Sequence, residues 1–572
     1  MAAVRTRAKA HSPRTITGGR AVVETLEAEG VEAVFGIPGV HNLPIYDALA
    51  EGSSVQHHLA RHEQGAVFMA DAYARVSGRV GVVLTTTGPG VTNALTALAN
   101  AYTDSSPLVF IATSVSSPNA SGRWGALHEL KDQHGLLSHT VSAALLVERP
   151  EEIEATLHRA FRLARGGRPG PVSVEIPVPF LLSQVPAASG NRATPEKAAL
   201  QAEERQACYS TEVGSGSPEL RASLEQAAAM LLQARYPLVY LGGGAAAAGV
   251  EEEARELVEL LGAPVLFSLQ GRGVIPDSHP LALGTTWRLE PTPDTYSGLW
   301  EQADLWLAIG TAFDAMNTGN WTLPVSPNLV QIDIDPAQIG RNYPARVGLP
   351  VDARVVLPLL LDELRAGGYQ GSAWRREQIE AEKRRIWQAG QRHSPPAFAL
   401  MEMLRQTLSD DAIIALDSTI AAFWMIRFLP LPRPRSLLFS GLATLGFGLP
   451  AAIGAKLAEP QRPVVAVAGD GGFLFTLEEL AAAMQARVSV PIIVVNDQRF
   501  GMIKAAQELE YDRRYIAVDL TNPDFVKLAR AFGAQGYRLE STRELPDTLR
   551  DALAAPGPTL IELPLALDPP LF

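Results

Sequence analysis

The chain has 572 residues, of which 47% are hydrophobic and 19% are charged, and its formal net charge at pH 7 is -12. This length exceeds what one hydrophobic core supports and predicts about three globular domains. The negative charge argues against nucleic acid or an anionic membrane as the main partner, and a single cysteine, Cys208, excludes an intrachain disulfide framework and indicates a cytoplasmic protein.

The first 15 residues are basic and lack the apolar stretch of a secretory signal. We expect a mobile arm there, with a transit peptide as the alternative. No apolar run in the chain approaches the roughly 20 residues of a membrane span, so we expect no membrane partner.

The first predicted block covers residues 14–185. Strand-like runs at 31–37, 80–86, 107–114 and 171–177 alternate with alanine-rich helical segments, which predicts a parallel sheet covered by helices. Within this block, residues 57–78 ("HHLARHEQGAVFMADAYARVSG") predict a strand that leads into a helix. Glu63 falls in the first helical turn, where an acid is favoured by the helix dipole whatever its other role.

The second predicted block covers residues 216–368 and follows a polar linker at 181–220. Its strand-like runs lie at 236–245, 263–269, 303–310 and 329–336. The glycines of "YLGGGAA" suit a dinucleotide, although one glycine cluster is weak support. A charged helical stretch at 372–396 predicts the second connection.

The third predicted block covers residues 396–566, with strand-like runs at 412–418, 463–472, 490–497 and 558–564. Two of these runs carry an acid at or near their ends, Asp470 and Asp497, and parallel strands would bring both to one sheet edge. Two such carboxylates repel each other unless a cation lies between them, and oxygen ligands suit Mg²⁺ or Ca²⁺. Thr476 and Glu479 have the spacing of a capping box, which predicts a helix start there.

The glycine amides around Asp470 and the following helix N-terminus supply donors for a phosphate. The sequence "GDGG", followed by a helix, a strand and Asn496-Asp497, resembles the cofactor-binding signature of thiamin diphosphate-dependent enzymes. The resemblance implies an α/β fold of three doubly wound parallel-sheet domains: pyrimidine-binding, central and diphosphate-binding. It also implies a homodimer or homotetramer with active sites at the subunit interface.

By the same resemblance, Asp470, Asp497 and the backbone carbonyl of Arg499 bind Mg²⁺. The family has asparagine where this chain has Asp497, which keeps an oxygen ligand and adds a negative charge. "RHEQGA" resembles the segment whose glutamate, here Glu63, hydrogen-bonds N1′ of the cofactor's aminopyrimidine and promotes loss of the thiazolium C2 proton. The further residues that the resemblance assigns to the cofactor are Pro38, Gly39, Asn93, Ser418, Thr419, Ala443, Leu445, Gly469, Gly471, Gly472 and Met502, with Leu445 bending the cofactor and Ala443 accepting from N4′.

Several stretches, among them "GRPGPVSVEIP" and "GFGLPAAIGAK", resemble acetohydroxyacid synthase. Four positions depart from that enzyme: His128 replaces a glutamine, Ala315-Met316 replaces an Asp-Arg pair, Ala506 replaces a tryptophan, and Thr419-Ile420-Ala421 replaces Gly-Gln-His. The lost arginine and tryptophan would hold a second oxo acid, and the changed run "GTAFDAMN" makes FAD unlikely.

The first block resembles a branch that includes the decarboxylase of 5-guanidino-2-oxopentanoate (2-ketoarginine). We therefore expect non-oxidative decarboxylation of a small-molecule 2-oxo acid to an aldehyde. An acetolactate synthase-type carboligase is the nearest alternative, a flavin oxidase is less favoured, and a regulatory paralogue would more typically lack one of Glu63, Asp470 and Asp497.

Substrate contacts are predicted at His41, His128 and Gln133, with Glu129, Asp132 or Glu508 as partners for a guanidinium. The sequence does not choose among 2-oxo acids, between dimer and tetramer, or among pathways.

Overall fold

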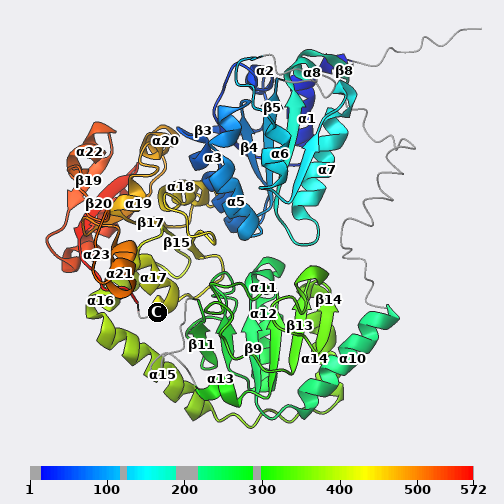
Figure 1. The fold of residues 1–572 in the computed structure, drawn as a ribbon, viewed down its shortest axis with the longest axis vertical. Coiled ribbons are helices and arrows are strands. Elements are labelled where there is room, and N and C mark those ends of the chain that lie inside the picture. The colour runs from blue at the N-terminus through cyan, green and yellow to red at the C-terminus, as the bar shows by residue number, and fades with distance from the viewer. Residues whose placement is uncertain (1–14, 116–124, 188–216, 288–297, 571–572) are drawn as a thin grey trace, which may run out of the picture.

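The computed structural model describes residues 15–115, 125–187, 217–287 and 298–570 (Figure 1). The predicted N-terminal arm and most of the predicted linker, with Cys208, lie outside the described residues. The chain forms three bodies, each built on its own sheet. In Figure 1 the second, green body lies below the first (blue to cyan) and the third (yellow to red).

Each body contains a six-stranded sheet in which all neighbouring strands are parallel. The first sheet has the order β3 (Gln56–Leu59), β2 (Ala33–Gly36), β4 (Gly81–Thr85), β5 (Leu108–Ser114), β7 (Pro171–Pro177) and β6 (Ala143–Leu146). The second has the order β11 (Ala282–Thr285), β10 (Val265–Phe267), β9 (Pro237–Leu241), β12 (Leu305–Ile309), β13 (Leu329–Asp333) and β14 (Val347–Pro350). The third has the order β16 (Leu437–Leu438), β15 (Ile413–Leu416), β17 (Val464–Gly469), β18 (Pro491–Asn496), β20 (Thr559–Pro564) and β19 (Gln535–Arg538).

The first and third sheets share one strand plan, and the second has another. In the first and third sheets the first strand lies inside the sheet. The second strand is added on one side of it, and the chain then crosses to the opposite side of the first strand. The reversal falls between β2 and β4 in the first sheet and between β15 and β17 in the third. Open α/β sheets bind ligands at the carboxyl ends of strands beside such a reversal, so these two edges are where a site is expected.

Helices cover both faces of the sheets (Figure 1), and the predicted α/β fold of three doubly wound parallel sheets is confirmed. The first body has α1 (Gly18–Ala28), α2 (Leu43–Ala50), α3 (Glu63–Ser77), α4 (Pro89–Thr92), α5 (Leu95–Thr103), α6 (Gln133–Ser138), α7 (Ile153–Arg165) and α8 (Val178–Leu182). The second has α10 (Pro218–Gln233), α11 (Gly243–Ala248), α12 (Glu251–Leu261), α13 (Gly298–Gln302) and α14 (Ala353–Ala366), after which α15 (Arg376–His393) forms the predicted charged connection. The third has α16 (Pro395–Thr407), α17 (Ile420–Phe428), α18 (Gly448–Ala458), α19 (Asp470–Phe473), α20 (Glu479–Ala486), α21 (Gly501–Glu510), α22 (Phe525–Ala531) and α23 (Leu545–Ala554).

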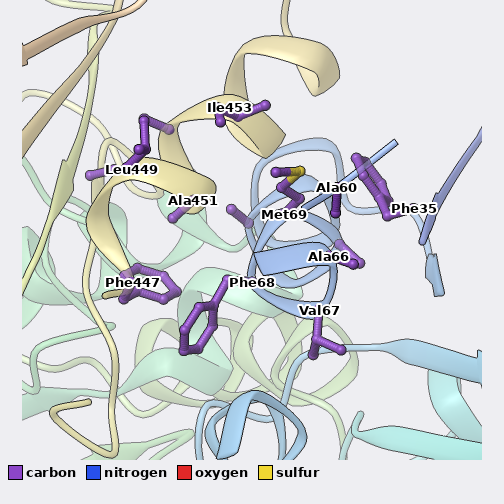
Figure 2. Close-up of a cluster of buried hydrophobic side chains, with 14 of the residues drawn as sticks. Phe35, Ala60, Ala66, Val67, Phe68, Met69, Phe447, Leu449, Ala451 and Ile453 are labelled. Atoms are coloured by element: carbon purple, nitrogen blue, oxygen red, sulfur yellow. The ribbon is translucent and has the colours of Figure 1, made fainter. Parts of the chain in front are cut away.

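The first and third bodies share one hydrophobic core, formed where α3 packs on α18 (Figure 2). Phe68 and Phe447 meet edge to face, with ring centroids 5.3 Å apart. A Cβ at Gly454 would lie 2.0 Å from the carbonyl oxygen of Met69, so only glycine allows this close approach of the helices. This packing ties the two predicted cofactor-binding bodies of one chain together.

Short elements complete the fold. β1 (Thr15–Thr17) and β8 (Gln184–Pro186) pair antiparallel and close the first body. Short 3₁₀ helices lie at Pro150–Glu152, Pro336–Gln338 and Thr542–Glu544. Within the described ranges, none of the helices has both the length and the apolar character that a membrane crossing requires.

Candidate active site

The two acids predicted to share a cation lie at the ends of adjacent strands. β17 and β18 pair in parallel, with Gly469 opposite Val495, so Asp470 and Asp497 follow the same edge of the third sheet. Asp470 is 2% exposed. Burial raises the pKa of Asp470 above its ordinary value, and the neighbouring charge of Asp497 raises it further. The electrostatics therefore favour a cation between the two carboxylates.

The extra charge of Asp497 has a counterpart within the chain. Nε of Arg499 lies 2.8 Å from Oδ2 of Asp497. The resembled motif implies a neutral asparagine at position 497, and this ion pair balances the negative charge that Asp497 adds. The predicted role of Arg499 uses only its backbone carbonyl, so its side chain is an additional feature that the motif did not indicate.

The donor set fits Mg²⁺ together with a diphosphate. In the described part of the chain, no group of three or more His, Cys, Asp or Glu side chains could hold a metal without help. Two carboxylates and a backbone carbonyl leave coordination positions for phosphate oxygens and water, which Mg²⁺ prefers to retain. A Cβ at Gly472 would lie 2.4 Å from Oδ1 of Asp417, which follows β15. This turn therefore needs glycine to pass so close to the end of β15.

Glu63 is the first residue of α3 and is 7% exposed. The side-chain amide of Asn93, at the end of α4, donates to Oε2 of Glu63 at 2.9 Å. The Pro38-Gly39 turn follows β2, and the amide of Gly39 donates to Oδ1 of Asn42 at 2.7 Å. Because β2, β3 and β4 are neighbours, the structure brings these predicted residues to one edge of the first sheet.

Buried Asp417 organises the predicted cofactor residues of the third body. It accepts from the backbone amides of Ser418 at 2.9 Å, Gly446 at 3.2 Å and Gly448 at 2.9 Å. Burial raises the pKa of Asp417 to about 6. Asp417 is not among the residues that the motifs indicate, although an acid directly after a buried strand is a signal of a functional role.

Several of the remaining predicted cofactor residues lie close to one another at this end of the third sheet. A Cβ at Gly469 would lie 3.0 Å from Oγ1 of Thr419, and one at Gly472 would lie 3.5 Å from Cδ2 of Leu445. Ala443 has a left-handed φ of 54°, a conformation that non-glycine residues adopt only when their surroundings hold it. Met502, on α21, packs on the core cluster that contains Ile420.

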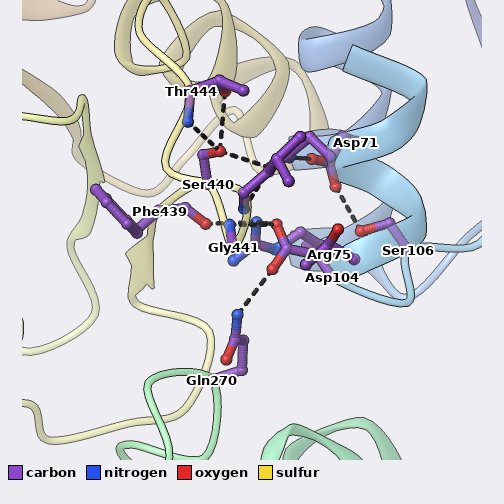
Figure 3. A network of polar contacts seen from close by, with 12 residues as sticks. Asp71, Arg75, Asp104, Ser106, Gln270, Phe439, Ser440, Gly441 and Thr444 are labelled. Carbon is purple, nitrogen blue, oxygen red and sulfur yellow. Dashed lines mark hydrogen bonds and ion pairs between the residues drawn. The ribbon is translucent and has the colours of Figure 1, made fainter. Parts of the chain in front are cut away.

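The segment that carries Ala443 is held by Asp104 (Figure 3). Asp104 accepts from Arg75 of α3 at 3.1 Å and from the backbone amide of Gly441 at 3.0 Å. Its other oxygen accepts from Gln270 at 2.7 Å. Residues from all three bodies therefore meet at one carboxylate.

Asn100, one helical turn before Asp104, makes a second set of contacts. Its side-chain oxygen accepts from the hydroxyl of Ser440 at 2.6 Å and from the amide of Leu442 at 3.3 Å. Its side-chain nitrogen donates to Asp71 at 2.9 Å, and the hydroxyl of Ser106 donates to the other oxygen of Asp71 at 2.5 Å. Burial raises the pKa of Asp71.

The capping box predicted at Thr476 and Glu479 is wrong. The hydroxyl of Thr476 donates to the carbonyl of Gly446 at 2.8 Å, and α20 begins three residues later, at Glu479 itself. The carboxylate of Glu479 instead accepts from the backbone amides of Arg61 at 3.0 Å and His62 at 2.9 Å. The backbone amides of the turn before Glu63 donate to Glu479, and these distant partners take the place of the predicted bond to the Thr476 backbone.

His41 and His128 lie together, with ring centroids 5.2 Å apart. Nδ1 of each ring is buried, and no described residue bonds to it. Burial lowers the pKa of His41, and the nearby His128 lowers it further. Gln133, the third predicted substrate residue, is engaged by the scaffold: it accepts from the amide of Gly88 at 2.9 Å and donates to Glu175 at 2.9 Å.

The three acids considered for a guanidinium each have a partner within the chain. Asp132 accepts from the amide of Gly135 at 2.7 Å and caps α6. Glu129 accepts from the amide of Ala126 at 2.9 Å. Glu508 lies 3.3 Å from Arg513 in an ion pair.

A cavity of about 1340 Å³ lies beside the second sheet. Its lining includes Gly243, Gly310, Asp333, Met316 and Arg168. The first two glycines follow β9 and β12, where the strand order of this sheet reverses. The predicted glycine turn therefore does border a cavity, and Met316 lies on its wall.

Comparison with known proteins agrees with this three-body arrangement. Residues 16–136 match the family described as thiamine pyrophosphate enzyme, N-terminal TPP binding domain. Residues 224–360 match the central domain of the same enzymes, and residues 417–563 match their C-terminal TPP binding domain. Thiamine pyrophosphate and thiamin diphosphate are the same cofactor.

Individual relatives cover nearly the whole chain. It is 38% identical over 561 residues to the probable 2-ketoarginine decarboxylase AruI of Pseudomonas aeruginosa, which covers 96% of this chain and 94% of the relative. It is 36% identical to the acetolactate synthase isozyme 3 large subunit of Escherichia coli, over 94% of this chain and 92% of the relative. It is 35% identical to the probable acetolactate synthase large subunit of Methanocaldococcus jannaschii, over 96% of this chain and 92% of the relative.

Proposed function

The chain belongs to the thiamine pyrophosphate enzymes, and from this premise we propose that it decarboxylates a 2-oxo acid to an aldehyde and CO₂ without oxidation. The proposed substrate is 5-guanidino-2-oxopentanoate, and the proposed metal is Mg²⁺. The observation that carries a decarboxylase over a synthase is the residue pair Met316 and Ala506. Met316 cannot form the ion pair with the carboxylate of a second oxo acid that an arginine would form, and Ala506 cannot supply the contact surface of a tryptophan.

The third body holds the charged end of the cofactor in this proposal. Asp470, Asp497 and the carbonyl of Arg499 would bind the cation. The amides of the glycine turn at residues 469–472 would donate to the diphosphate. Support comes from the burial of Asp470 and from its repulsion by Asp497, both of which a cation relieves.

The first body supplies the acid-base group. Thiamin diphosphate, when bound, supplies the electron sink that loss of CO₂ from a 2-oxo acid requires. Glu63 would hold a proton at N1′ of the aminopyrimidine, with its carboxylate oriented by Asn93. Ala443 and Leu445 would position the two rings of the cofactor, and Asp417 keeps their segment against the strand end.

His41 and His128 are proposed to orient the substrate carboxylate and to move a proton to the product. The lowered pKa of His41 favours the neutral ring, which offers one donor and one acceptor. Gln133 is proposed to position the Gly88 turn, because its amide is already bonded to the scaffold.

A carboligase that joins two 2-oxo acids is the second candidate. The relatives named acetolactate synthase, at 35–36% identity, favour it. For either reaction we propose a homodimer or homotetramer with its active sites between subunits, as the family resemblance implies. Domain limits at 14–185, 216–368 and 396–566 are part of the same proposal.

The test is a CO₂-release assay with thiamin diphosphate and Mg²⁺ on pyruvate, 2-oxobutyrate, benzoylformate and 5-guanidino-2-oxopentanoate. Products are identified by mass spectrometry, with Glu63→Gln as the inactive control. An aldehyde from the guanidino acid, with pyruvate nearly inert, supports the decarboxylase. Acetolactate from pyruvate overturns it in favour of the carboligase.

A further inference from the structure

Asn522 lies between α21 and α22 and is not part of the motif that assigned the metal site. Its Nδ2 donates to Oδ2 of Asp470 at 2.6 Å and to Oδ1 of Asn496 at 3.0 Å. Asp470 follows β17 and Asn496 ends β18. A third segment of the chain therefore bridges the two strand ends where the cation is proposed.

The orientation of this amide is fixed by its neighbours. Nδ2 of Asn496 donates to Oε1 of Glu562 at 2.8 Å, so Oδ1 of Asn496 must face Asn522 as an acceptor. Turning the Asn522 amide over would put its oxygen against the carboxylate of Asp470. Nδ2 of Asn522 thus donates to two acceptors, and its Oδ1 accepts no hydrogen bond from the described residues.

Oδ1 of Asn522 is buried, and none of the described residues donates to it. A buried amide oxygen without a donor is unfavourable, and native structures contain few of them. This oxygen belongs to a side chain that touches one of the two proposed carboxylate ligands. The simplest reason for leaving it unpaired is a ligand at this edge of the sheet.

The segment that carries Asn522 is held against the other proposed ligands. The amide of Phe500 donates to the carbonyl of Val518 at 2.8 Å, and the amide of Leu520 donates to the carbonyl of Gln498 at 2.8 Å. Arg499 and Asp519 face each other between these bonds as an antiparallel bridge. Neither bond uses the carbonyl of Arg499.

We propose that Asn522 is a further residue of the magnesium site. Nδ2 fixes the orientation of Asp470, and Oδ1 accepts a hydrogen bond from one of the waters that Mg²⁺ keeps. This inference rests on the proposed function, because it presumes a cation between Asp470 and Asp497. It makes Asn522 a positioning residue for metal binding and gives it no part in the reaction itself.

The experiment measures Mn²⁺ binding by the full-length protein in the presence of thiamin diphosphate, with free Mn²⁺ read by electron paramagnetic resonance. We expect Asn522→Ala and Asn522→Leu to weaken Mn²⁺ binding by roughly 10- to 100-fold, the range for removing a residue that orients a metal ligand. The matched control is Thr521→Ala, an exposed neighbour, which should bind as the wild type does. Thermal unfolding without metal checks that each variant folds, and Asn522→Ser replaces any variant that does not.

A variant Asn522→Asp separates a metal role from a purely structural one. A carboxylate beside Asp470 should lower the unfolding temperature without metal and increase the gain on adding Mn²⁺. Equal Mn²⁺ affinity in the wild type and the alanine variant would overturn the inference and leave the proposed function intact. A wild-type protein that binds no Mn²⁺ with the cofactor would overturn both.

Discussion

The side-chain amide of Asn93 donates a 2.9 Å hydrogen bond to Oε2 of Glu63. The two residues lie 30 positions apart, one at the end of α4 and one at the start of α3. The bond holds one carboxylate oxygen and thereby orients the other. Glu63 therefore has a fixed direction before any ligand arrives.

Replacement of Glu63 by glutamine tests its proposed acid-base role. Glu63→Gln keeps the size of the side chain and removes its ability to exchange a proton. We expect nearly unchanged cofactor affinity in calorimetry and turnover lower by about 10²–10⁴-fold. Asn93→Ala, which frees the carboxylate without removing it, should cost less, and undiminished turnover in Glu63→Gln would take this residue out of the mechanism.

The metal assignment is tested by the pair Asp470→Ala and Asp497→Asn. The first removes a ligand, and we expect metal-dependent cofactor binding to be lost in calorimetry. The second introduces the asparagine that the resembled motif implies at this position, which keeps an oxygen ligand, so it should bind the metal and the cofactor. Unchanged affinity in Asp470→Ala would refute the metal site.

Glu479 predicts a pH dependence of stability. Burial raises its pKa from 4.5 to about 7, so the folded protein holds a proton that the unfolded chain releases. The buried carboxylate is unfavourable when it is ionised, and this lowers the free energy of unfolding. The loss is absent below pH 4.5, grows as the pH rises, and is complete above about pH 7. Glu479→Gln keeps an acceptor for the two amides, and its stability advantage over the wild type should grow between pH 5 and 8 to roughly 3 kcal/mol. Urea unfolding across this range measures the difference, and a difference independent of pH would contradict the assignment.

Asn100 is predicted to support both stability and cofactor binding. Asn100→Ala leaves Asp71, Ser440 and the amide of Leu442 without a common partner, and we expect a loss of roughly 2–4 kcal/mol in the free energy of unfolding. Ser106→Ala, which removes one bond to Asp71, should cost only about 1 kcal/mol. Because the same contacts hold the segment of Ala443, the affinity for thiamin diphosphate should also fall in Asn100→Ala. An unchanged affinity would show that this segment holds its conformation without the network.

The prediction that FAD is absent is tested by the colour of the purified protein. Met316 stands where the resemblance to acetohydroxyacid synthase implies an arginine, and we expect no visible flavin absorption band. The cavity of about 1340 Å³ beside the second sheet gives a flavin space to occupy. A yellow protein that releases flavin on denaturation would contradict the prediction.

The position of a strand in its sheet decides whether the sequence predicts it. Central strands such as β5 and β18 are buried on both faces, so they read as continuous apolar runs. Edge strands such as β16, with two residues, and β19, with the run "QGYR", lack such runs. Their pairing depends on the neighbouring strand, which a local window of sequence does not contain.

The sequence by itself determined the fold class and the family, because glycine turns, buried strands and acids at strand ends are local features with fixed spacing. It also located both acids of the proposed metal site. Only the tertiary structure decided what lies beside them: Asn93 against Glu63, Arg499 against Asp497, Asn522 across Asp470, and Glu479 against the turn of Arg61 in place of the predicted capping box. Such contacts join residues up to 418 positions apart. A polar side chain pairs with whichever buried polar group nearby has no other partner. That choice exists only after the chain has folded.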